Sequence, residues 1–173
     1  SKVLKDFLSF VEKNPKHQKD LIEATDNEDI EKNAKSLSNL GTYYLKTGDK
    51  QKALKNYKEA LKQNPSDFKL LRDVILLHLE LKQFKEALKQ SEIALEFYPA
   101  QPILYLLNGV SNINLSVPKK AIDSLETGLD FLVENPTMER DFYMQLSEAY
   151  KLTNNNAKSK AFAIKAQAIK EQK

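Results

Sequence analysis

Apolar residues recur along most of the chain at intervals of three and four positions, which is the spacing of an amphipathic helix. One such run contains Leu37, Leu40, Tyr44 and Leu45, and it is followed by the turn residues Thr47-Gly48-Asp49. Another run with helical spacing begins after this turn. The pattern therefore predicts a unit of helix, turn and helix.

Small residues mark the second helix of each unit and return at a fixed period. Ala53, Ala87 and Ala121 are 34 residues apart, and so are Ala60, Ala94 and Gly128. Residues at i and i+7 lie two turns apart on one helical face, so a small pair lets a neighbouring helix approach closely. The period predicts stacked helix pairs. We expect helices near 34–46, 51–63, 68–81, 85–97, 102–115, 118–134, 139–152 and 156–171, and no strands.

The most regular unit covers residues 34–67. It contains Leu37-x2-Leu40-Gly41-x2-Tyr44, followed by Gly48-Asp49, Ala53, Tyr57, Ala60 and Pro65. This pattern resembles the tetratricopeptide repeat, and bacterial arrays of that family in particular. Looser copies follow at 68–101, 102–139 and 140–173. The resemblance implies an all-α fold, a right-handed α-solenoid of stacked antiparallel helix pairs.

Two parts of the chain depart from the period. Gly128 and Ala166 are 38 residues apart instead of 34, which predicts a second helix lengthened through Phe131 and Leu132. Residues 1–33 suggest the last helix of a beheaded repeat plus an inserted helical segment. Within them, Thr25-Asp26-Asn27-Glu28 has the pattern of a capping box that opens a long helix running to about Lys46. We expect a single structural unit, cut from a longer protein.

Composition narrows the possible functions. The 173 residues carry 27 basic and 24 acidic side chains, with two arginines and no cysteine. The absence of cysteine excludes disulfide scaffolds and thiol chemistry, and the near balance of charge with few guanidinium groups disfavours nucleic acid as a partner. Since no apolar run approaches the roughly 20 residues of a membrane span, we expect a soluble chain without membrane insertion. The compartment remains open.

The sequence shows no arrangement typical of catalysis. His17 and His78 are the only histidines, and neither has a second ligand or base in a useful pattern. The carboxylates Glu28, Asp29 and Glu31 are more typical of a helix start than of a cation site. We therefore predict that the chain is not an enzyme and holds no cofactor or metal.

The resemblance implies a function in binding. First helices of the family line a concave groove that holds a segment of a partner protein. The corresponding residues here are Lys35, Ser38, Thr42, Lys69, Arg72, Leu76, Leu79, Leu106, Val110, Ile113, Met144 and Glu148. The apolar members, from Leu76 to Met144, are expected to form a contiguous stripe. The Lys and Asn clamp by which one branch of the family grips a C-terminal carboxylate is absent.

The leading interpretation is a protein-protein interaction scaffold that binds a protein or peptide in this groove. Two alternatives stay open. In the first, the chain is a structural solenoid segment whose groove is filled by its own chain or by self-association. In the second, it is the non-catalytic part of a larger enzyme or assembly.

Overall fold

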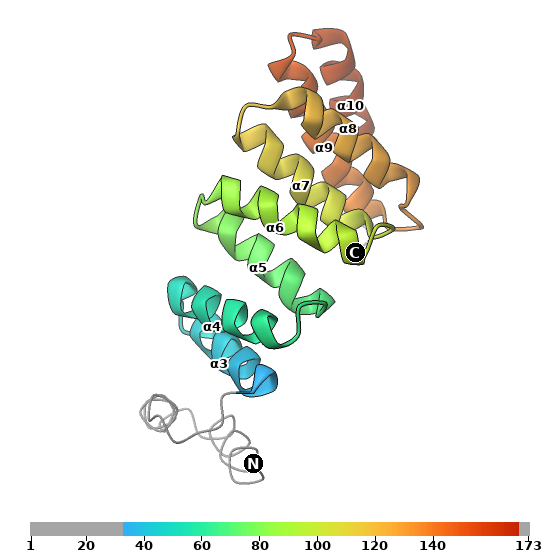
Figure 1. Cartoon of the computed structure of the whole chain (residues 1–173). Helices are drawn as coiled ribbons and strands as arrows, with labels where there is room; N and C mark the ends of the chain where they lie inside the picture. The colour runs from blue at the N-terminus through green and yellow to red at the C-terminus, as the bar shows by residue number, and fades with distance from the viewer. Residues whose placement is uncertain (1–32, 170–173) are drawn as a thin grey trace.

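The computed structural model describes residues 33–169. This range folds into eight α-helices without any strand (Figure 1). They are α3 (Ala34–Lys46), α4 (Lys50–Gln63), α5 (Phe68–Glu80), α6 (Phe84–Phe97), α7 (Pro102–Asn114), α8 (Pro118–Asp130), α9 (Pro136–Leu152) and α10 (Asn156–Ala168). Consecutive helices pack as pairs, and each pair contacts the next. The predicted all-α solenoid of stacked antiparallel helix pairs is confirmed.

Most helices begin at a polar residue that caps their first turn. The side chains of Asn33, Asp49, Asp67, Asn135 and Asn155 each accept a hydrogen bond of 2.9 to 3.1 Å from the backbone N–H three residues later. Such caps satisfy amides that have no partner inside the helix. In addition, α7, α8 and α9 start with proline, whose fixed φ suits the first helical position.

One turn conformation joins the two helices of every pair. The residues at its centre have positive φ: 84° at Gly48, 58° at Lys82, 59° at Ser116 and 59° at Asn154. The next amide then donates back to the preceding helix, as in Asp49 N to Tyr44 O at 2.9 Å and Gln83 N to His78 O at 2.8 Å. Only the first of these turns has the glycine that such a φ favours.

The small residues of the repeat lie where helices touch. Ala53, Ala60, Ala87, Ala94 and Ala121 have no exposed surface. Glycine acts similarly within two pairs, because a Cβ at Gly41 would lie 2.5 Å from the Tyr57 ring. A Cβ at Gly109 would lie 2.5 Å from Leu125 Cγ. The sequence period thus reports helix pairs packed more closely than a larger side chain allows.

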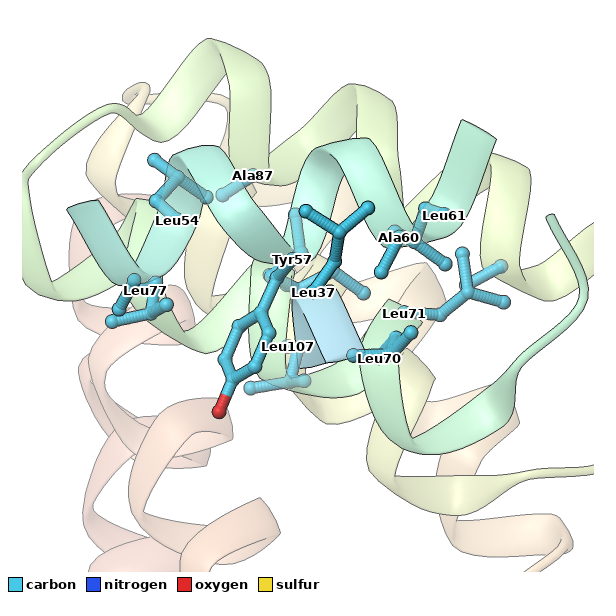
Figure 2. Packing of buried hydrophobic residues seen from close by; sticks show 14 of the residues in the cluster. Leu37, Leu54, Tyr57, Ala60, Leu61, Leu70, Leu71, Leu77, Ala87 and Leu107 are labelled. Atoms are coloured by element: carbon cyan, nitrogen blue, oxygen red, sulfur yellow. The ribbon is translucent and has the colours of Figure 1, made fainter. Parts of the chain in front are cut away.

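The apolar core consists of two clusters. The first runs from Leu37 in α3 to Leu107 in α7, and part of it is shown in Figure 2. The second runs from Leu106 in α7 to Tyr150 in α9, with Phe162 of α10 packed against it. Ile103 of α7 packs against both clusters, so this helix lies at their junction.

A buried polar layer lies on the same helix. Asn108 Nδ2 donates to Ser91 Oγ of α6 at 3.0 Å, and Asn112 Nδ2 donates to Asn108 Oδ1 at 2.9 Å. Ser111 Oγ donates to Leu107 O at 2.8 Å. These side chains are at most 8% exposed, so the hydrogen bonds offset the loss of their contacts with water.

The prediction for the four extra residues of the third unit is wrong. The second helix, α8, ends at Asp130 and does not continue through Phe131 and Leu132. A short connection follows, in which Glu134 has a φ of 38°. Asn135 then caps α9, which starts at Pro136 and has 17 residues. The extra length therefore belongs to the connection and to the first turn of α9, and position 139 lies inside this helix.

The long first helix expected from Thr25 is also wrong at its start. Asn33 has an extended backbone, with ψ of 164°, and caps a helix that begins at Ala34. At the other end, α10 stops at Ala168, and Ile169 is extended. The remaining predictions for 1–32 and 170–173 lie outside the described residues.

Candidate partner-binding face

The twelve predicted groove residues lie on the four first helices, α3, α5, α7 and α9. We call the surface that they define the predicted groove face. α5 contacts α7, and α7 contacts α9, so these helices are neighbours along the stack. The face has a polar part on α3 and α5 and a more apolar part on α5, α7 and α9.

On α3, the polar side chains are tied to the helix pair. Lys35 is exposed, whereas Ser38 and Thr42 are half-buried. Thr42 Oγ1 donates to Ser38 O at 3.0 Å and lies 3.0 Å from the hydroxyl of Tyr57 on α4. Thr42 therefore contributes to joining α3 and α4 as well as to the surface.

On α5, Asp73 organises the two cations of the face. Lys69 Nζ donates to Asp73 Oδ2 at 2.9 Å, and Arg72 donates to Oδ1 through Nε at 3.1 Å and Nη2 at 2.9 Å. The hydrogen bond to Asp73 raises the pKa of Lys69. The Asp73 side chain is only 16% exposed, while those of Lys69 and Arg72 are 60% and 37% exposed. One carboxylate thus positions two cations at the surface.

The apolar residues of the face differ widely in exposure. Leu76 is 37% exposed and Met144 is 52% exposed. Leu79, Val110 and Ile113 are half-buried, and Leu79 and Ile113 pack against the two core clusters. The side chains that remain most accessible for contact therefore lie on α5 and α9.

Leu106 is a core residue. It is 7% exposed and belongs to the second core cluster with Phe142 and Leu146 of α9. The expectation that Leu106 faces an open surface is wrong, because α9 packs against α7 and covers it. Helical periodicity places a residue on a side of a helix but does not report how closely the next first helix lies.

A cavity of about 580 Å³ lies beside Met144, between α9 and α10. Its lining consists of Arg140, Met144, Ser147, Ala163, Ala166, Gln167 and Ile169. Only Met144 was expected to be a binding residue. The small residues at 163 and 166 were visible in the sequence as repeat positions, yet nothing there indicated an open space beside them. Glu148, next on α9, is exposed and pairs with Lys151 at 3.7 Å.

His78 takes the position that the repeat pattern reserves for tyrosine, and it is 4% exposed. Its Nδ1 lies 2.7 Å from Gln83 Oε1 and must donate to it, because an amide oxygen is an acceptor. Burial lowers the pKa of His78 below its ordinary value of 6.5. Within residues 33–169, no three His, Asp or Glu side chains lie together as metal ligands would.

No helix in the described part of the chain is long and apolar enough to cross a membrane.

Comparisons with known proteins agree with this architecture. The family model "Tetratricopeptide repeat" matches residues 34–67. Curated protein sequences show no significant match.

Solved structures provide matches along most of the chain. MamA from Desulfovibrio magneticus RS-1 is 19% identical, with 97% of this chain and 93% of that chain covered and a TM-score of 0.78. MamA AMB-1 is 19% identical, with 96% of each chain covered and a TM-score of 0.76. TTC0263, a thermophilic TPR protein of Thermus thermophilus, is 19% identical, with 80% of this chain and 75% of that chain covered and a TM-score of 0.65. The chain thus contains a tetratricopeptide repeat at 34–67 and has the fold of tetratricopeptide repeat solenoids.

Proposed function

We propose that this chain is a non-catalytic protein-interaction module that binds an extended segment or a helix of a partner protein on the predicted groove face. The observation that carries the proposal is the exposure of large apolar side chains on the first helices. Leu45, Leu76, Met144 and Leu152 are 38%, 37%, 52% and 44% exposed. Burying such side chains against a partner yields roughly 25 cal/mol for each Å² of apolar surface.

The charges on this face suggest the chemistry of the partner. Lys35, Lys69 and Arg72 lie on α3 and α5, whereas Glu148 lies on α9. A bound segment with apolar anchors and acidic residues toward α3 would complement this distribution. Arg72 is held by Asp73 before any partner arrives, so little side-chain entropy is lost when it forms a contact.

A peptide selection followed by calorimetry tests the proposal. Peptides are selected from a random displayed library on the whole chain, and their affinities are then measured for the wild type and for Leu76→Asp/Met144→Asp. Since both side chains are exposed, we expect this variant to stay folded and to lose at least tenfold in affinity.

The matched control is Phe97→Asp/Ile164→Asp, which also replaces two exposed apolar residues by aspartate, but on the second helices α6 and α10. We expect it to bind like the wild type. Equal loss in both variants, or none in the first, would contradict the proposal. A wild-type dimer that Leu76→Asp/Met144→Asp converts to a monomer would favour the self-association alternative.

A further inference from the structure

The second helix of the first pair, α4, carries an unusual concentration of positive charge. Its 14 residues include five lysines and one glutamate. Three of the lysines have carboxylate partners: Lys50 pairs with Glu80 at 2.9 Å, Lys52 with Asp49 at 3.4 Å and Lys62 with Glu59 at 2.6 Å. Lys55 and Lys58 have no such partner within residues 33–169.

The two unpaired lysines line the same cavity. It has a volume of about 610 Å³ and lies over α5 between α4 and α6. Its lining consists of Gln51, Leu54, Lys55, Lys58, Glu59, Lys62, His78, Gln83 and Glu86. Lys55 and Lys58 are one turn apart on α4, so two like charges stand side by side, an arrangement that disfavours the helix slightly. A bound anion would relieve this repulsion.

The α4 members of the lining form a line. Gln51, Lys55, Lys58 and Lys62 are spaced by four, three and four residues, which places them on one face of the helix. By the helical rise of about 1.5 Å per residue, the line is about 16 Å long. An extended peptide of about five residues has this length, and its alternate side chains are about 6.7 Å apart, close to the spacing of successive lysines.

We propose that this cavity, which we call the lysine cavity, binds an acidic extended segment of a partner protein along α4, on the side of the stack formed by second helices. Lys55 and Lys58 pair with alternate carboxylates of the segment. The amide groups of Gln51 and Gln83 lie in the same lining and can pair with its backbone.

The lining favours a peptide over other polyanions. It contains no arginine, the residue best suited to bidentate phosphate contacts, and no aromatic ring on which a base could stack. Glu59 and Glu86 at the same cavity would repel a flat anionic membrane surface. A narrow segment can place its carboxylates at Lys55 and Lys58 and avoid these two groups.

Fluorescence anisotropy at low ionic strength tests this inference on the whole chain. The probe is a labelled Glu-Ala-Glu-Ala-Glu-Ala peptide with a blocked C-terminus. We expect Lys55→Gln/Lys58→Gln to weaken binding at least tenfold. The matched control, Lys85→Gln/Lys89→Gln on α6, removes the same charge outside the cavity and should change the affinity less than twofold. Circular dichroism melting should show that both variants are as stable as the wild type.

Other outcomes would overturn the inference. Equal loss in both variants would mean that only net charge matters. Binding of a single-stranded oligonucleotide or of anionic phosphatidylserine vesicles that is as strong and as sensitive to Lys55 and Lys58 would mean an unselective polyanion surface. A tenfold gain in affinity on neutralising Asp26, Glu28, Asp29 and Glu31 would mean that the chain's own acidic run occupies the cavity. Leu76→Asp/Met144→Asp should leave probe binding unchanged, so failure here is distinct from failure of the proposed groove function.

Discussion

At the scale of single residues, the fold depends on side chains that replace the usual residue of the repeat without losing its contacts. His78 lies where Tyr44 lies in the first pair, and it bonds to Gln83 at the start of α6 instead of presenting a phenol. Asn112 takes the same position in the third pair and joins the polar layer with Asn108. These replacements make individual helix pairs chemically different on a shared backbone.

The environment of His78 predicts a pH dependence of stability. Burial is the main cause of its lowered pKa; Gln83 opposes the shift, Lys58 adds to it and Glu86 opposes it. The unfolded chain therefore binds a proton more readily than the folded chain, and this contribution to stability is lost as the pH falls through about 6.5. In urea unfolding at pH 7.5 and 5.5, the wild type should lose more free energy of unfolding than His78→Gln. An equal loss in both proteins would contradict the buried neutral imidazole.

At the scale of helices, the boundaries follow local capping more closely than the repeat period. The third pair shows this, because α8 ends at Asp130 and the chain then turns through Glu134 to the cap at Asn135. A count of residues could not distinguish a longer α8 from a longer α9. The dipeptide Asn135-Pro136, which combines a cap with a proline at the first helical position, was the signal that favoured the second.

The caps themselves can be tested. Asn135 Oδ1 accepts from Met138 N at 3.0 Å, so Asn135→Ala should lower the free energy of unfolding by about 1 kcal/mol. Gln101, the residue before α7, forms no side-chain capping bond. Gln101→Ala is therefore the control and should change stability by less than about 0.5 kcal/mol. Urea unfolding measures both values, and indistinguishable losses would show that the Asn135 cap contributes nothing.

Much of the architecture could be predicted from the sequence, since buried alanines such as Ala87 and Ala94 are small for a packing reason that repeats every 34 residues. The candidate site could be predicted only in part. Leu76 and Leu106 have the same character and lie on equivalent helices, yet one is exposed and the other buried. That difference depends on contacts between helices distant in sequence, which periodicity does not encode. The lysine cavity escaped prediction for the same reason, because its lining combines α4, α5 and α6.

At the scale of the whole molecule, the core is divided into two clusters that share α7, with buried Ser91, Asn108 and Asn112 at the junction of α6 and α7. Stability in such a stack accumulates from contacts between neighbours. The surface and the core therefore contribute separately: exposed residues of the first helices can serve binding, while buried residues on the same helices hold the pairs together.

This separation predicts opposite effects for two similar substitutions. Leu106→Asp places an unpaired charge among Phe142 and Leu146 and should cost about 3 kcal/mol or more, or prevent folding. Leu76→Asp changes an exposed side chain and should cost less than about 1 kcal/mol. Thermal and urea unfolding provide the comparison. A large loss in a monomeric Leu76→Asp protein would show that Leu76 belongs to the core.

The most direct test of partner binding on the first helices is NMR mapping of the wild-type chain, labelled with ¹⁵N, during titration with a peptide selected from the library. Our account predicts amide shift changes concentrated in α3, α5, α7 and α9, near Arg72, Leu76 and Met144, with little change in α6 and α8. Shift changes confined to the second helices would contradict it.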